Sequence, residues 1–190
     1  FYLHCDPTMS HYLKTVCDII FGADNYLNDI VWQRTNSHND PSRFGRIDDR
    51  ILFYSKSVDY IFNNTFVEHS EDYLGKFYKY EDEKGVYRLD NLANPKPGGY
   101  LYDYKGYKPP ANGWRLPVKT MEERDKNGLI HFPKNKEGRL SFKRYLNTSK
   151  GKLIQSIWND IARLDSQSSE RLGYPTQKPK ALLERIIKAS

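Results

Sequence analysis

The sequence predicts an α/β fold whose core is interrupted by a β-rich insert. Near the N-terminus, short apolar runs of strand length flank a segment with helical apolar spacing. From about residue 63 to residue 152 this periodicity disappears, and Tyr, Lys, Gly and Pro dominate. Apolar residues then become frequent again, and within residues 181–190 they recur at helical spacing. We therefore expect two core segments, residues 1–62 and 153–190, around an insert at residues 63–152.

The sequence of the first core segment predicts a strand, a helix, a strand, a loop and a strand, in that order. Residues 1–5, 30–34 and 51–54 are apolar runs, which suit buried strands of a mainly parallel sheet. Between the first two runs, apolar residues recur at helical spacing until Gly22, which is a stop signal. Thr8 stands where the N-cap of this helix is expected.

Short aromatic runs alternate with turn residues through the insert. The runs at residues 78–80, 100–104 and 129–132 lie between Gly and Pro residues, and we expect each to form a small strand. Thr120, with Glu123 three residues later, has the pattern of a capping box and predicts one short helix. The insert is thus predicted to be mostly β-structure with irregular loops.

The turn before the last helix combines a hydroxyl, a proline and a lysine. Thr176 is placed to cap the helix, and Pro179 is tolerated in a first turn, where the amides have no intrahelical partner. Lys178 is less expected, because the positive end of the helix dipole disfavours a cation. Free amides beside a cation suit a bound carboxylate or phosphate. The alternative is a capped surface helix whose Lys178 faces water, and the local chemistry alone favours it.

The composition fits a polyanionic partner. The chain has 30 Lys and Arg against 24 Asp and Glu, a net charge of +6, and 15 Tyr that suit a recognition surface. Its two cysteines, Cys5 and Cys17, form no CxxC pair, which is typical of a protein in the reducing cytoplasm. Together with His4 and His11 they match no zinc-ligand spacing, so we expect no metal site. No apolar run approaches the ~20 residues that a membrane span needs.

The C-terminal segment carries a resemblance to a family of enzymes. Residues 171–179, Arg-Leu-Gly-Tyr-Pro-Thr-Gln-Lys-Pro, resemble the cofactor-side motif of the β-class DNA amino-methyltransferases, which act on adenine N6 or cytosine N4 and include modification subunits of type III restriction systems. Further blocks continue the resemblance in order: residues 2–8, 10–14, 20–22, 28–32, 49–57, 113–114, 128–133, 143–146 and 158–161. The resemblance implies a partial Rossmann-like methyltransferase core with a β-rich target-recognition insert. It also implies S-adenosylmethionine as cofactor, with Thr176, Gln177 and Lys178 bordering its methionine part.

Two hallmarks of that family are missing from these 190 residues. There is no Asp-Pro-Pro-Tyr tetrapeptide, which holds the target amino group, and no Phe-x-Gly-x-Gly turn, which cradles the cofactor. Asp6-Pro7-Thr8 is no substitute, because it lacks the second proline and the aromatic residue. We therefore expect a central fragment with no catalytic residue of its own, weak or absent cofactor binding, and no activity alone. Asp48 stands where the family often has histidine, and we build no mechanism on that position.

The insert occupies the target-recognition position of the family, and its composition suits contact with DNA. Basic side chains position phosphates, and aromatic side chains stack on bases. The candidates for DNA contact are Lys105, Lys108, Trp114, Arg139, Lys143 and Arg144. The resemblance implies double-stranded DNA, a second copy in a homodimer and a restriction subunit as partners. Two alternatives stay open: a non-catalytic DNA-binding module, and an RNA-directed binder with the same basic, tyrosine-rich surface.

Overall fold

The structure, a computed structural model, describes residues 1–190 and divides the chain into two compact units. The core unit consists of Phe1–Val67 and Lys152–Ser190, and the insert unit of Glu68–Gly151. The boundaries expected from the sequence, at residues 62/63 and 152/153, lie near those of the two units. In neither unit is a helix long and apolar enough to reach across a lipid bilayer.

The sheet of the core unit has four strands in the order β1 (Tyr2–Cys5), β3 (Asp48–Tyr54), β2 (Tyr26–Gln33) and β10 (Ile157–Trp158). Strand β3 is antiparallel to both of its neighbours, and only β10 pairs with β2 in parallel. The expectation of a mainly parallel sheet is therefore wrong. The connections give the reason: α1 (Ser10–Phe21) carries the chain back so that β2 runs in the direction of β1, whereas residues 34–47 turn it directly into β3.

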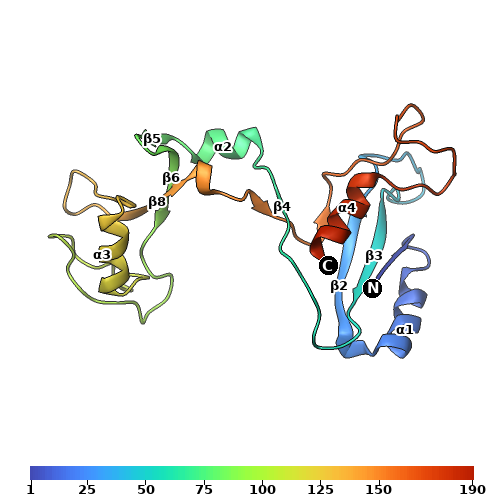
Figure 1. Ribbon diagram of the computed structural model, residues 1–190, viewed down its shortest axis with the longest axis horizontal. Helices are drawn as coiled ribbons and strands as arrows, with labels where there is room; N and C mark the ends of the chain where they lie inside the picture. The colour runs from blue at the N-terminus through green and yellow to red at the C-terminus, as the bar shows by residue number, and fades with distance from the viewer. The chain divides into compact units, whose positions relative to one another are not determined.

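Different helices cover the two faces of this sheet (Figure 1). Ile51 and Phe53 of β3 pack in a cluster with Leu182 of α4 (Lys180–Ala189), whereas Leu52 and Tyr54 pack in a cluster with α1. Successive residues of a strand point to opposite faces, so a strand that is buried on both faces must be apolar throughout. This explains the unbroken apolar run at the end of β3.

Two short strands stand where the core unit meets the insert in the sequence: β4 (Phe66–Val67) pairs antiparallel with β9 (Lys152–Leu153). The chain therefore leaves and re-enters the core unit through two adjacent strands. Within the core unit, the 3-10 turn η1 (Ala23–Asn25) connects α1 to β2.

Trp32 of β2 ties the sheet to the segment that follows β10. Its side chain is almost fully buried, and its Nε1 donates a hydrogen bond of 2.8 Å to the carbonyl oxygen of Ile161. Because Ile161 lies beyond the insert in the sequence, this bond joins the two separate parts of the chain that make up the core unit.

The predicted cap of α1 is wrong. The helix begins at Ser10, and the carboxylate of Asp6 accepts hydrogen bonds from the backbone amides of Thr8 and Met9 in the preceding turn. The bonds from Thr8, the largest effect, and from Met9 lower the pKa of Asp6. An ionised carboxylate accepts more strongly than a hydroxyl, so Asp6 rather than Thr8 organises this turn.

The threonine caps predicted for the other two helices are also absent. Helix α3 (Val118–Lys126) begins after Pro117, so Thr120 lies within its first turn instead of before it. Helix α4 begins after Pro179 with no side-chain cap from Thr176. Its first backbone amide, of Lys180, donates to the carboxylate of Glu170 at 3.0 Å. The carboxylate that the sequence suggested at this turn therefore comes from the chain itself.

The insert unit has an antiparallel sheet in the order β5 (Tyr80–Asp82), β6 (Gly85–Asn91), β8 (Ser141–Tyr145) and β7 (Ile130–His131). The same unit also contains the helices α2 (Glu71–Phe77) and α3 and the 3-10 turn η2 (Leu146–Thr148). The predicted strand at residues 100–104 is wrong, because that segment makes only isolated bridges. The buried core of this unit is formed by Leu92, Tyr104, Tyr107, Trp114, Met121, Ile130 and Leu140.

A close crossing of two backbone segments places Trp114 in this core. Gly113 has φ = 78°, which residues with a side chain rarely adopt, and a Cβ atom there would lie 2.5 Å from the carbonyl carbon of Gly99, so a side chain at this position would clash. The Nε1 of Trp114 donates to the carbonyl oxygen of Tyr102 at 2.9 Å. The ring is therefore a structural anchor with its one donor satisfied.

Asp82 joins the β5–β6 hairpin to β8. Its carboxylate accepts from Lys143 Nζ at 2.7 Å and from the hydroxyl of Tyr145 at 2.8 Å. The hydrogen bond from Lys143, the largest effect, lowers the pKa of Asp82 to about 2, and burial beside this carboxylate raises the pKa of Tyr145 to about 12. The three side chains thus favour an ionised Asp82 and a neutral Tyr145.

Replacing Trp32 by Phe is expected to lower the free energy of unfolding of the core unit by about 1–3 kcal/mol, because the carbonyl of Ile161 loses its donor and the smaller ring leaves space. Urea denaturation followed by circular dichroism measures the change. Tyr12→Phe, at an exposed aromatic position, is the control and should leave stability unchanged.

Stability of the insert unit should fall at low pH through Asp82. The pKa of Asp82 is lower in the folded protein than in the unfolded chain, where it is near 4. The contribution of Asp82 to the free energy of unfolding is therefore complete above about pH 4 and is lost as the pH falls toward about 2. Asp82→Asn should lower the melting temperature at pH 7 and flatten its decline between pH 4 and pH 2. An unchanged acid profile in the variant would refute this role.

Candidate functional site

The loop before α4 is organised by its own side chains. Gln177 accepts a hydrogen bond from the amide of Leu172 at 2.7 Å and donates one to the carbonyl oxygen of Glu170 at 2.6 Å. Lys178 Nζ donates to the carbonyl oxygen of Thr176 at 2.8 Å. Both polar atoms of Gln177 are therefore occupied, and its place in the structure is to hold the turn.

A cavity of about 480 Å³ opens beside this loop. It is lined by Glu170, Leu172, Tyr174, Gln177, Lys178, Lys180 and Leu183. A carboxylate and two ammonium groups thus share one cavity with apolar and aromatic surface. Such a set matches a zwitterionic amino-acid group attached to a less polar body. Of the three residues predicted to border a cofactor, Gln177 and Lys178 line this cavity and Thr176 does not.

A charged cluster lies where β1 ends and β3 begins. The carboxylate of Asp49, a residue only 7% exposed, lies 2.8 Å from His4 Nε2 and 3.0 Å from Arg34 Nε. The neighbouring thiol of Cys5 has its pKa raised by burial and by nearby carboxylates, so it remains protonated and is a poor nucleophile. The cluster therefore joins β1 and β3 to the residue that follows β2.

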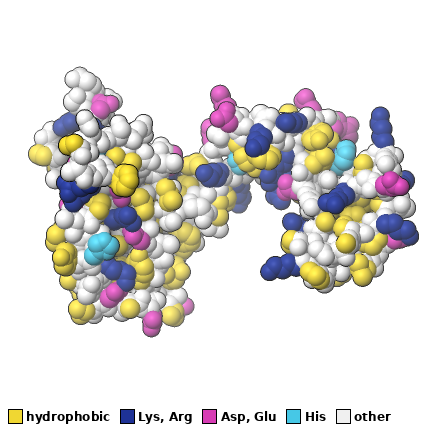
Figure 2. All heavy atoms as spheres, turned by 180° about the vertical axis from the view of Figure 1, so that it is seen from behind, with side chains coloured by type: hydrophobic (Ala, Val, Ile, Leu, Met, Phe, Trp, Pro, Cys, Tyr) yellow, Lys and Arg dark blue, Asp and Glu magenta, His cyan; other side chains and the backbone are white.

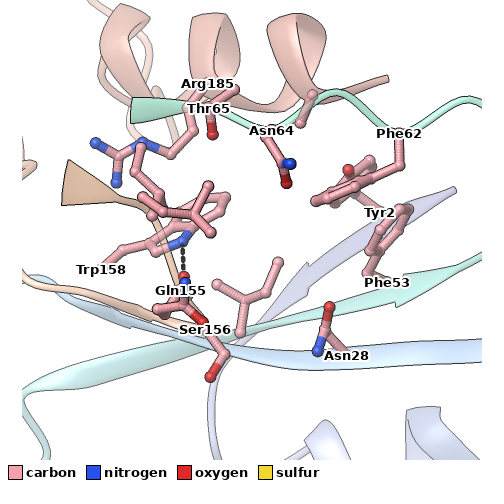
Figure 3. A pocket seen from close by; sticks show the side chains of 14 residues that line it. Tyr2, Asn28, Phe53, Phe62, Asn64, Thr65, Gln155, Ser156, Trp158 and Arg185 are labelled. Carbon is pink, nitrogen blue, oxygen red and sulfur yellow. Dashed lines mark hydrogen bonds between the residues drawn. The ribbon is translucent and has the colours of Figure 1, made fainter. Parts of the chain in front are cut away.

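A second cavity of the core unit, about 270 Å³, lies between the sheet and α4 (Figure 3). Tyr2 and Phe53 stack along one side with ring centroids 4.2 Å apart, and Asn28 and Asn64 point toward the space from opposite sides. Arg185, the charged residue of the lining, is neutralised by two hydrogen bonds to Asp160. No lining hydroxyl has a histidine or carboxylate of the lining to activate it, so the cavity has no pair for acid–base chemistry.

Positive charge is concentrated in the insert unit. Glu68–Gly151 contains 17 Lys and Arg against 12 Asp and Glu, whereas the core unit contains 13 against 12. The insert unit therefore holds +5 of the net charge of +6. Figure 2 shows its dark blue side chains projecting from several sides with magenta ones between them, so the basic groups do not form a single continuous face in that view.

Two of the residues predicted to contact DNA are neutralised by neighbouring carboxylates but stay accessible. Lys105 pairs with Asp125, and Lys108 pairs with Asp103 at 2.5 Å; both ammonium-bearing side chains are more than half exposed. Exposed ion pairs of this kind are weak, so a phosphate can compete for either lysine.

Two other predicted DNA contacts prove to be structural. Trp114 is 1% exposed, so its ring cannot reach a nucleobase, and this expectation is corrected. Lys143 is largely buried, pairs with Asp82, and lies 5.0 Å from the ring centre of Tyr87. Releasing it toward DNA would leave the carboxylate of Asp82 without its cation.

The remaining two predicted residues are available to a ligand. Arg144 pairs with Asp90 at 2.7 Å but is half exposed, and Arg139 is exposed without a carboxylate partner. Several exposed cations of the insert unit outside the six candidates for DNA contact also lack an ion pair. They are Lys79, Lys96, Lys119, Lys126 and Lys134. No sequence signal separates them from paired cations, because ion-pair partners are often distant in sequence: Lys126 directly follows Asp125 and still has no ion pair.

The profile of the DNA methylase family matches residues 1–190. The chain is 30% identical over 193 residues to the Type II methyltransferase M.EcaI of Enterobacter cloacae, an alignment that covers 100% of this chain and 42% of that protein. It is 27% identical to the Type III restriction-modification enzyme EcoP15I Mod subunit of Escherichia coli and 28% identical to the StyLTI Mod subunit of Salmonella typhimurium, with 78% and 93% of this chain and 29% of each relative covered. The chain thus spans less than half the length of these curated relatives. On this evidence the chain belongs to the DNA methylase family of N6-adenine and N4-cytosine enzymes, as the resemblance of its C-terminal motif predicted.

Proposed function

We propose that these residues are the central part of a methyltransferase that moves a methyl group from S-adenosylmethionine to adenine N6 or cytosine N4 in double-stranded DNA. In this proposal the core unit is part of a Rossmann-like methyltransferase core, and the insert unit is its target-recognition part. The observation that carries the proposal is the concentration of positive charge in the insert unit of a DNA methylase. Phosphate contacts need this charge, and the nearly neutral core unit supplies little of it.

The cavity beside α4 suits the amino-acid end of the cofactor. When bound, S-adenosylmethionine supplies an electrophilic methyl group. Lys178 would face the carboxylate of its methionine part, and the free oxygen of Glu170 would face the ammonium group. Gln177 would act through the loop, because its amide already bridges Glu170 and Leu172. Thr176 remains a proposed neighbour that supplies backbone rather than a hydroxyl contact.

The target amino group must leave the duplex before it can react, because pairing and stacking bury it. In the family an Asp-Pro-Pro-Tyr segment receives it, and these residues contain no such segment. The core unit would therefore form walls of the reaction chamber without supplying its catalytic groups. The relatives named as Mod subunits support a restriction subunit as a partner, and we also propose a homodimer. Two free thiols, Cys5 and Cys17, fit a cytoplasmic protein.

Arg139→Ala should weaken binding of the chain to duplex DNA several-fold and reduce the slope of log affinity against log salt by about one, because one phosphate contact is lost. Fluorescence anisotropy over a salt series measures both quantities. Lys56→Ala, which removes one exposed charge from the core unit, is the matched control and should change binding much less. Equal losses in the two variants would show that only net charge matters and would refute the role of the insert unit. Tighter binding to RNA than to duplex DNA would favour an RNA-directed function.

The 190-residue chain alone should transfer no methyl group. Incubation with duplex DNA and S-adenosylmethionine carrying a labelled methyl group tests this, and M.EcaI in the same assay is the positive control. Label in the DNA after incubation with the chain would contradict the division of roles proposed here, since turnover would then need groups within these residues.

A further inference from the structure

The loop between β2 and β3, residues 35–47, is closed at its base by backbone hydrogen bonds. The amides of Arg34 and Thr35 both donate to the carbonyl oxygen of Ile47, at 2.8 and 3.3 Å. Arg34 is also held by the buried carboxylate of Asp49. The loop therefore projects from a fixed point at one end of the sheet.

Internal contacts give this loop a defined shape. Asp40 accepts hydrogen bonds from the amide and hydroxyl of Ser42 at 3.1 and 2.9 Å and from Arg43 Nε at 2.8 Å. These bonds, with that from Arg43 the largest effect, lower the pKa of Asp40. The backbone at Gly45 approaches His38 so closely that a Cβ atom would lie 2.5 Å from its carbonyl oxygen. The loop is folded on itself around these two contacts.

Phe44 stands next to this crossing and is 100% exposed. A loop with so many internal bonds could bury an aromatic ring against its own backbone, yet this ring makes no ring contact in the structure. The backbone of this loop is already ordered, so binding would restrict mainly the side-chain torsions of Phe44, and burial of its apolar ring by a ligand would be favourable. The ring of Phe44 is therefore available for contact with a ligand.

The groups around Phe44 favour a nucleic acid as that ligand. Arg43 and Arg46 flank Phe44 in the sequence. Arg43 pairs with Asp40, whereas Arg46 donates to the hydroxyl of Thr8 at 3.0 Å and acts on the carboxylate of Asp6 without forming an ion pair with it. The polar segment at residues 36–39 adds amide and imidazole groups. An apolar protein partner would bury these groups at a cost, whereas phosphates and base edges hydrogen-bond to them.

We propose that the loop at residues 35–47 is a second DNA-contacting element, on the core unit, in which Phe44 stacks on or wedges between nucleobases and Arg46 contacts a phosphate. This inference rests on the proposed function, because it requires that the chain bind DNA. Aromatic side chains used in this way stack on bases of any sequence or open base steps. The loop would bind DNA of any sequence, whereas the insert unit would recognise the target sequence.

The test uses the full 190-residue chain and a short duplex of mixed sequence at fixed low salt. Phe44→Ala should lower the affinity on the order of tenfold, as for the loss of one stacking contact, with an unchanged salt slope because no charge is removed. Val58→Ala, at an apolar position of the core unit that is 87% exposed, is the matched control and should bind as the wild type does.

Phe44→Trp gives a direct readout, because Trp32, Trp114 and Trp158 are all at most 5% exposed. The introduced indole should be quenched by acrylamide in the free protein and become protected when DNA binds, whereas the indole of Val58→Trp should stay accessible. If the wild type binds DNA but Phe44→Ala binds equally well and the indole stays accessible, this inference is overturned and the proposed function stands. If the wild type fails to bind DNA, both are overturned. Protection that rises with protein concentration without DNA would instead show a contact between copies of the chain and overturn the inference.

Discussion

Burial of β3 on both faces is the constraint on which the rest of the core unit depends. Its alternate side chains enter two separate clusters, so each face needs its own cover, and α1 and α4 provide it. Polar contacts fix the α1 side: the hydroxyl of Tyr54 donates to Asp18 at 2.7 Å, and Lys14 pairs with the same carboxylate. Burial and this carboxylate raise the pKa of Tyr54, so the hydroxyl stays a donor. Because α4 closes the other face, the loop before it is held at a defined place beside the sheet.

Much of the fold could be predicted because burial and periodicity act locally. The strand at residues 51–54, the helix ending at Gly22 and the final helix all follow from apolar spacing, and the structure has each of them. Strand direction could not be predicted, because an apolar run buried on both faces has the same composition in parallel and antiparallel sheets. The predicted threonine caps are absent for a different reason. A threonine signal was present in each case, but the amides before α1 and α4 were taken by the carboxylates of Asp6 and Glu170.

The candidate DNA contacts were less predictable than the elements, because they depend on distant partners. Lys143 pairs with Asp82 and Arg144 with Asp90, which lie 61 and 54 residues away in the sequence. Asp90 stands on β6, the neighbour of β8, and Asp82 stands on β5, one strand further across the sheet, so only the arrangement of the strands brings these charges together. The burial of Trp114 was unpredictable for a similar reason. An aromatic residue among basic ones is typical of a binding surface, yet the crossing of Gly99 and Gly113 turns this ring inward.

The two units differ in net charge because the insert unit has more Lys and Arg, and their carboxylates also take different structural places. In the core unit, single carboxylates organise three loops: Asp6 before α1, Asp40 between β2 and β3, and Glu170 before α4. Each accepts backbone amides, so it satisfies main-chain donors that a loop would otherwise expose to water. In the insert unit, Asp82 and Asp90 pair with a lysine and an arginine of the sheet, and several cations beyond these pairs stay exposed on the surface. In the proposed function, the loop before α4 would hold a small ligand, whereas the free cations of the insert unit would attract a polyanion.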